Sequence, residues 1–184
     1  MPAFTPHAIR LASVYFPILV DCARNQQLIT YGNLVARAKE LYPHSEEVQS
    51  AIPTSSGQKL DVIRTFCRKR DLPDLASLVV NAKTGAPGES DPLRHIADEL
   101  QQQAFAYDWD SQSTAFDAHI VEEAARATPL VKRKKPDAEH LLFQYYANNK
   151  ADLPADIKQY REDILDLLIE GHEVADAFAM ALQN

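Results

Sequence analysis

The residues best suited to bind a metal lie far apart in this sequence. Its six histidines are spread over the chain, and none stands in a familiar zinc-binding spacing such as His-Glu-x-x-His. His119 is followed by Glu122 and Glu123, which would share its side of a helix. A solvated polar helix face is the simpler interpretation of that trio. We therefore expect no metal site and no cofactor.

The sequence also gives little indication of a catalytic nucleophile. The two cysteines, Cys22 and Cys67, both fall within predicted helices. Cys67 lies on the apolar side of its helix, where a thiol is buried and inert rather than activated as a thiolate. The Gly-x-Ser-x-Gly turn that presents a nucleophilic serine is absent. We expect two buried free thiols, no catalytic residue and no enzyme.

Phosphate contacts are the chemistry that the pattern favours most. Residues 54–59 place hydroxyls, a glycine and a lysine at the start of a helix predicted over 58–70, where free backbone amides attract anions. Ordinary N-capping explains the same residues. A basic run ends that helix, and residues 132–135 form a second one. Helix-dipole stabilisation and solvent exposure are the structural alternatives for these two runs. The expected nucleic-acid contacts, with the first residue near base edges and the others on phosphates, are Gln58, Lys59, Arg64, Arg68, Lys69 and Arg70.

Apolar spacing predicts that helices position these residues. Helical stripes cover residues 7–25, 31–41, 58–70, 93–104 and 116–127, and three more lie between residues 137 and 182. Only 28–30 and 75–81 read as strands. Thr30 is placed to cap the second helix, and Gly171 to end the penultimate one. The predicted fold class is mainly α with a small β-sheet (α+β), with Leu34, Ile63, Phe66, Leu78 and Val80 buried together.

Charge suggests a division of the chain. Residues 1–88 carry ten Lys/Arg and seven Asp/Glu, a net charge of +3, whereas residues 89–184 carry nine and nineteen, a net charge of −10. Strong turn signals at residues 83–88 mark the change. We therefore expect a module at residues 1–88 and an acidic helical region at 89–184. No apolar run is long enough for a bilayer, and the start lacks a signal-peptide pattern, which predicts a cytoplasmic protein without a membrane partner.

Three short stretches of residues 28–88 stand in a familiar order. They are Ile29-Thr30-Tyr31-Gly32, then Leu72-Pro73 leading to Leu78-Val79-Val80, and finally Gly85-Ala86-Pro87-Gly88. In this order they resemble the winged-helix DNA-binding module of the alkyltransferase-like proteins. The resemblance implies a winged-helix-like module at 1–88 that docks helix 58–70 on DNA. The reactive Pro-Cys-His-Arg motif of that family is absent, because the comparable place reads Pro73-Asp74-Leu75-Ala76.

Two functional hypotheses follow from these patterns. The first is a non-enzymatic nucleic-acid-binding protein with an accessory or regulatory role, which would use residues 58–70. The alternative is a protein-binding inhibitor, immunity or assembly protein, which would meet a basic partner through residues 89–184 by charge complementarity. The sequence leaves the oligomeric state open.

Overall fold

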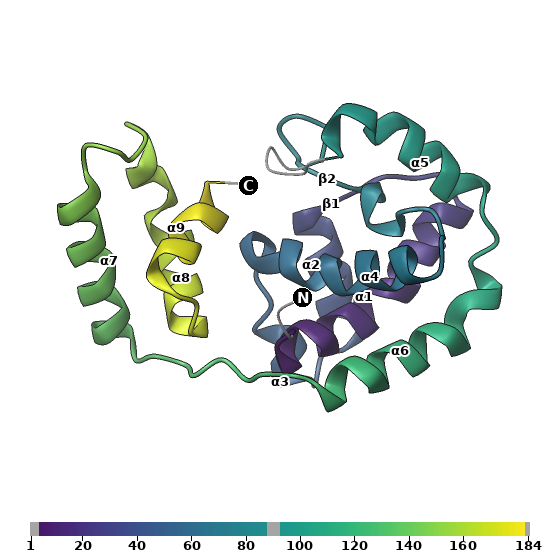
Figure 1. Cartoon of the computed structure of the whole chain (residues 1–184), viewed down its shortest axis with the longest axis horizontal. Coiled ribbons are helices and arrows are strands. Elements are labelled where there is room, and N and C mark those ends of the chain that lie inside the picture. Colours follow the sequence, from purple (N-terminus) through teal and green to yellow (C-terminus); the bar gives the residue numbers. More distant parts are fainter. Residues whose placement is uncertain (1–3, 88–92, 183–184) are drawn as a thin grey trace. The chain divides into compact units, whose positions relative to one another are not determined.

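The computed structural model describes residues 4–87 and 93–182, most of which are helical (Figure 1). The chain divides into two compact units, residues 1–129 and 130–184. The predicted fold class is confirmed, since the described helices are accompanied by one small two-stranded sheet. No helix of the described part is long and apolar enough to cross a membrane.

Helix α1 (Pro6–Arg24) is the centre of the first unit. Twelve of its nineteen residues are buried, because apolar side chains occupy most of its circumference. Thr5 begins the helix by accepting a hydrogen bond from the amide of Ala8 (3.0 Å). Pro17 lies inside the helix on its exposed side, so α1 continues through it instead of ending there. Helices α2 (Tyr31–Leu41), α4 (Ser56–Lys69), α5 (Ala97–Ala106) and α6 (Ser113–Ala125) pack against α1.

The sheet joins two distant parts of the first unit. Strand β1 (Ile29–Thr30) pairs in parallel with β2 (Val79–Val80), with Ile29 opposite Val79 and Thr30 opposite Val80. The second strand is shorter than predicted, since Leu75–Leu78 forms a turn of 3₁₀-helix, η2. Thr30 caps α2 as predicted, by accepting from the amide of Asn33 (3.2 Å).

An aromatic cluster fills the core of the first unit. Phe16 stacks on Phe116 with ring centroids 3.9 Å apart, and Phe66 meets both rings edge-on. Trp109 is buried beside Phe16 and donates its indole N–H to the carbonyl of Ala104 (2.8 Å). All five residues of the predicted core are buried, but only Leu34, Ile63, Phe66 and Leu78 belong to this common core, and Val80 lies outside it. Short helical segments complete this unit: α3 (Glu46–Gln49), η1 (Pro53–Ser55), η3 (Arg94–Ile96) and η4 (Asp110–Gln112).

The second unit is a small helical unit with its own core. It consists of α7 (Lys135–Asn149), η5 (Ile157–Tyr160), α8 (Arg161–Glu170) and α9 (Val174–Ala181). Leu167, Leu168 and Phe178 are buried at its centre. Gly171 ends α8 as predicted, in the left-handed conformation with φ +106°.

The boundary expected near residue 88 is therefore corrected to residues 129/130. Residues 88–92 lie outside the described part, but α5 and α6 beyond them pack on α1 and supply Phe116 to its core. Counted over the two units, the charge is nearly even. Residues 1–129 carry twelve Lys/Arg and sixteen Asp/Glu (net −4), and residues 130–184 carry seven and ten (net −3). The change of net charge at residue 88 indicated the wrong boundary, because the acidic residues of α5 and α6 lie on the surface of the first unit.

Candidate binding surfaces

The predicted nucleic-acid helix is largely a core helix. Eight of the fourteen residues of α4 are buried, and the helix packs against α1 and η2. Lys59 is only 2% exposed and donates to the hydroxyl of Ser55, which is itself buried. The expected phosphate contact by Lys59 is therefore wrong. The physical reason is spacing, since Lys59 stands four and seven residues before Ile63 and Phe66, on the face that the helix turns to the core.

The buried start of α4 also changes the expected anion site. Ser55 and Ser56 are fully buried, and neither caps the helix. Their hydroxyls instead approach the carbonyl of Ile52, at 3.5 and 3.2 Å. These hydroxyls therefore serve internal hydrogen bonding rather than an accessible phosphate site. Gln58 is half-buried at the same end of the helix.

Arg64 is occupied by carboxylates of its own unit. Its Nε lies 3.3 Å from Asp74 Oδ2, and its NH1 lies 3.4 Å from Asp61 Oδ1. The side chain of Arg64 is only 19% exposed, and that of Asp74 is 13% exposed. The pair fastens α4 to the turn before η2. Both carboxylates therefore compete with a phosphate group for Arg64.

Among the six predicted contacts, exposed positive charge gathers at the C-terminal end of α4. Arg68, Lys69 and Arg70 are all exposed there. Lys69 donates to Glu123 Oε1 (2.9 Å), and the guanidinium of Arg70 lies 5.4 Å from the centre of the Phe66 ring. Arg68 takes part in no ion pair seen among the described residues. Three of the six predicted contacts are thus exposed together at one end of α4, whereas Lys59 is buried and Gln58 and Arg64 are half-buried.

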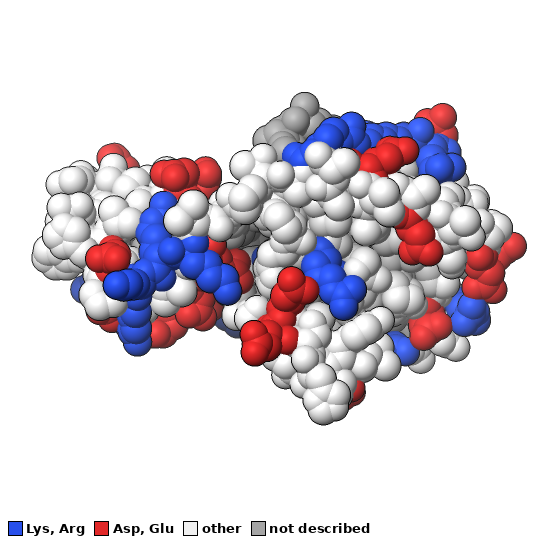
Figure 2. Space-filling model, turned by 90° about the horizontal axis from the view of Figure 1, so that it is seen from below, with Lys and Arg blue, Asp and Glu red and all other residues white. Residues whose placement is uncertain are grey.

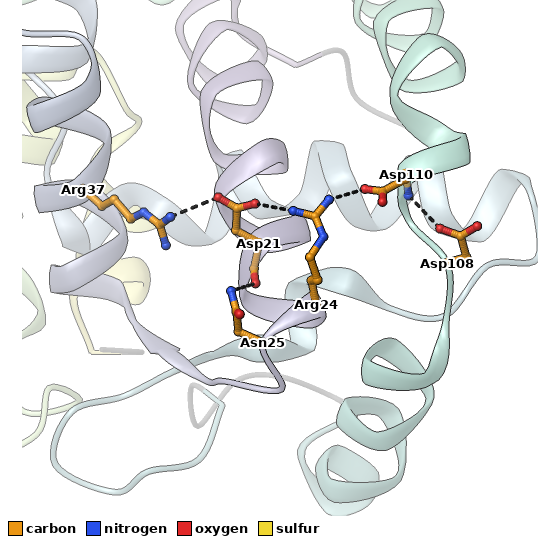
Figure 3. A network of polar contacts seen from close by, with 6 residues as sticks. All are labelled: Asp21, Arg24, Asn25, Arg37, Asp108 and Asp110. Carbon is orange, nitrogen blue, oxygen red and sulfur yellow. Dashed lines mark hydrogen bonds and ion pairs between the residues drawn. The ribbon is translucent and has the colours of Figure 1, made fainter.

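Surface ion pairs occupy further cations of the first unit. In the network of Figure 3, Asp21 accepts from Arg37 at 3.0 Å and from Arg24 at 3.1 Å, and Arg24 also contacts Asp110. These pairs link α2, α1 and η4. On the face that Figure 2 shows, basic side chains gather along the upper edge of this unit with acidic ones bordering them, and elsewhere the two kinds are mixed. Such a mixed surface attracts the phosphate backbone less than a continuous basic stripe does.

His119 and Glu123 form a buried polar cluster rather than a solvated helix face. His119 Nε2 lies 3.2 Å from the carbonyl oxygen of Val62 on α4, and its Nδ1 lies 3.7 Å from Glu123 Oε1. The same carboxylate oxygen accepts from Lys69 and from Arg126 (2.8 Å). The cluster joins α6 to α4. In the part of the chain that is described, no three His, Cys, Asp or Glu side chains are placed to hold a metal ion.

The electrostatics of this cluster favour neutral His119 and charged Glu123. Burial lowers the pKa of His119, although the Val62 carbonyl and Glu123 act in the opposite direction. Burial alone would raise the pKa of Glu123, but the hydrogen bond and charge of Lys69, with the charge of Arg126, hold it below its ordinary value. The sequence signal for the cluster was the i, i+4 spacing of 119 and 123. The cluster is buried because α4 packs over it, and the i, i+4 spacing within α6 gives no information about α4.

Both cysteines are free and buried, as predicted. Burial raises the pKa of the Cys67 thiol to about 12. Burial also raises the pKa of Cys22, with Arg37 opposing it. A thiol with so high a pKa carries almost no thiolate at neutral pH, so Cys67 is not a suitable nucleophile.

A pocket of about 370 Å³ lies between Gly85–Pro87 and Arg94–Glu99. Gln101, at its edge, donates to the carbonyl of Ser77 (3.1 Å) and so fixes α5 to η2. The lining contains both bases and carboxylates. This mixture selects neither an anion nor a cation.

The second basic run is held against the second unit. Arg133 donates its amide to the carbonyl of Ile169 (3.1 Å), and its NH1 donates to the carbonyls of Leu168 (3.2 Å) and His172 (2.5 Å). Arg133 therefore satisfies carbonyls that the end of α8 leaves free. Lys132, Lys134 and Lys135 are exposed around it.

Helix α7 exposes an apolar surface that the sequence reasoning missed. Its only fully buried residue is Ala138, and Phe143 is 68% exposed. Four neighbours of Phe143 are only half-buried: Leu141, Leu142, Tyr145 and Tyr146. These five residues, which we call the α7 surface, are bulky and surround the helix. A helix that is apolar on several sides is normally covered on several sides. Here α8 and α9 are the described elements that cover it.

Comparison of the chain with protein families, with curated proteins and with solved structures finds no match. The winged-helix resemblance of residues 28–88 therefore stays a prediction.

Proposed function

We propose that this chain is a non-enzymatic binding protein that docks a protein partner through the helical unit 130–184. The observation that carries the proposal is the α7 surface, with Phe143 at 68% exposure. The other four residues of the α7 surface are half-buried against the core of the unit, so Phe143 is an exposed aromatic ring at the edge of that core. Exposed apolar side chains of this kind mark protein interaction sites when they are rimmed by polar residues. Aromatic residues supply much of the binding energy at such sites.

The arrangement of the cations favours this proposal over nucleic-acid binding. Among the six residues expected to meet DNA or RNA, Lys59 is buried and Arg64 is paired with carboxylates. Lys69 is paired as well, so the end of α4 offers only a short basic surface. Nucleic-acid affinity rises with the number of phosphates neutralised. A surface this short supports weak binding at most.

Site-specific photo-crosslinking tests the proposal. A photoreactive amino acid replaces Phe143 in the full chain, and the matched control replaces Val121, which is 69% exposed on α6. The chain is expressed in the cells that make it naturally and irradiated there. We expect a protein adduct of one defined mass from position 143 and none from position 121. The adduct is identified by mass spectrometry, and its protein must bind the purified chain less tightly after Phe143→Ser. Equal labelling at both positions, or none at 143, would refute the proposal.

A further inference from the structure

Along one face of α7, the side-chain types follow one another in a symmetric order. Glu139, Phe143 and Tyr146 of α7, and Lys150 at its C-cap, follow one another at intervals of four, three and four residues. At 3.6 residues per turn they lie within about 60° of one another around the helix axis. The order along the stripe is acid, aromatic, aromatic, base. We call these four residues the α7 stripe.

The α7 stripe is accessible to a partner. Phe143 and Lys150 are exposed, whereas Glu139 and Tyr146 are half-buried, and one side of the Tyr146 ring packs against the core of its own unit. The nearest base to Glu139 is Arg161, whose NH2 lies 3.9 Å away, at the limit of an ion pair. None of the ion pairs among the described residues involves Lys150. Both charges of the stripe are therefore open to a better partner.

From this stripe we infer that the protein partner proposed above is a second copy of this chain, bound through an antiparallel pair of α7 helices. A two-fold axis between positions 144 and 145 places Glu139 of each copy opposite Lys150 of the other. The same axis places Phe143 of each copy opposite Tyr146 of the other. The inference rests on the proposed function, and it names the partner.

The pairing is complementary in charge and in apolar surface. Four aromatic rings meet at the centre of the contact, where edge-to-face and offset contacts are favourable. Two Glu–Lys pairs flank them, about 16 Å apart along each helix. A parallel pair would instead set like charges side by side. The α7 stripe therefore specifies a second copy as the partner and an antiparallel direction of the two α7 helices.

The expected dimer is weak. A contact between two fifteen-residue helices is small compared with stable protein interfaces, so the dissociation constant should lie in the micromolar to millimolar range. Sedimentation equilibrium of the purified full chain over that range measures it. Phe143→Ser should raise the dissociation constant about thirtyfold, because each copy loses a central aromatic ring. The matched control Val121→Ser should leave it unchanged.

Charge reversal tests the direction of the helices. Glu139→Lys alone sets two lysines together, and Lys150→Glu alone sets two glutamates together, so each should weaken the dimer about tenfold. The double variant Glu139→Lys, Lys150→Glu restores both pairs and should recover the dimer. A mixture of the two single variants should recover the dimer as well, because their heterodimer sets the two lysines of one copy opposite the two glutamates of the other.

The outcomes separate this inference from the proposed function. Dimerisation that Phe143→Ser weakens and that the double reversal restores supports an antiparallel α7 pair. A monomer at all concentrations, with a crosslinked adduct of another protein at position 143, refutes the second copy and keeps the binding function. A monomer with no adduct refutes both. A dimer that is insensitive to Phe143→Ser overturns the α7 pairing.

Discussion

Replacing Gly171 by alanine should destabilise the second unit selectively. Gly171 has φ +106°, a conformation that costs an L-residue about 1–2 kcal/mol. A Cβ atom there would also lie 2.5 Å from the carbonyl oxygen of Val131 and 2.9 Å from its carbonyl carbon. Because this neighbour is backbone, the segment before α7 must move.

That movement carries a second cost. Val131 is two residues from Arg133, whose hydrogen bonds hold the segment to the end of α8. Each such bond contributes about 1 kcal/mol net, so the total loss should be about 2–4 kcal/mol. For a unit of this size, a loss of that order lowers the melting temperature by at least about 10 °C.

Two optical signals distinguish the units in the assay. Trp109 is the only tryptophan of the chain and is buried in the first unit, so its fluorescence reports that unit alone. Far-ultraviolet circular dichroism reports the helices of both. Gly171→Ala should move the circular-dichroism transition of the second unit and leave the Trp109 transition in place. The control is Gly57→Ala in α4, where nothing beyond the two neighbouring residues and the helix's own backbone lies within 4 Å of the Cβ position. This variant should be neutral or stabilising by up to about 1 kcal/mol. An unchanged circular-dichroism transition, or an equal shift of the Trp109 signal, would refute the reasoning.

Four further predictions concern the first unit. Phe66→Ala should cost about 3–5 kcal/mol of unfolding free energy, because the ring is 1% exposed; a loss within error in urea titration would contradict its core position. Cys67 should resist thiol reagents in the folded chain, and fast labelling measured by mass spectrometry would disprove its inertness. The folded-state pKa values of His119 and Glu123 lie below their unfolded values, so protonation favours unfolding. The free energy of unfolding should therefore fall as the pH drops below 6.5, because His119 is protonated, and fall further below pH 4.5, because Glu123 is protonated. In a plot of the urea midpoint against pH, Glu123→Gln should remove the decrease below pH 4.5. Duplex DNA and single-stranded RNA should bind weakly at low salt, and the double variant Arg68→Ala, Arg70→Ala should abolish that binding. Lys59→Met should leave the salt dependence of binding unchanged, because Lys59 contacts no phosphate. Binding that stays steeply salt-dependent without both arginines would show that further basic residues contact the nucleic acid.

Local patterns predicted the elements because the information for them is local. The bounds of α2 and its Thr30 cap follow from a few neighbouring residues, and so does the left-handed Gly171. The strand at Val79 was predicted too long because η2 packs against α1, α4 and α5, and that packing overrides the β-propensity of the sequence.

The candidate site was harder to predict because burial is decided by other elements. Lys59 was assigned to a polar face from its charge, although its spacing to Ile63 and Phe66 already placed it toward the core. The exposure of Phe143 could not be read from α7, since it depends on which sides α8 and α9 leave uncovered. Charge content likewise failed to mark the boundary, because solvated carboxylates occur on core-forming helices such as α6.

The central position of α1 has a consequence for how the chain is made. The ribosome completes this helix long before Phe116, which stacks on its Phe16, has been translated. At about 5–20 residues per second, the roughly 100 residues from Arg24 to the end of α6 take about 5–20 s. Helices α2 and α4 follow α1 early, but the part of α1 that α5 and α6 cover stays exposed on the nascent chain throughout that interval. The first unit should therefore need protection by a chaperone during synthesis, and the second unit, whose helices are close neighbours in sequence, should fold soon after it emerges.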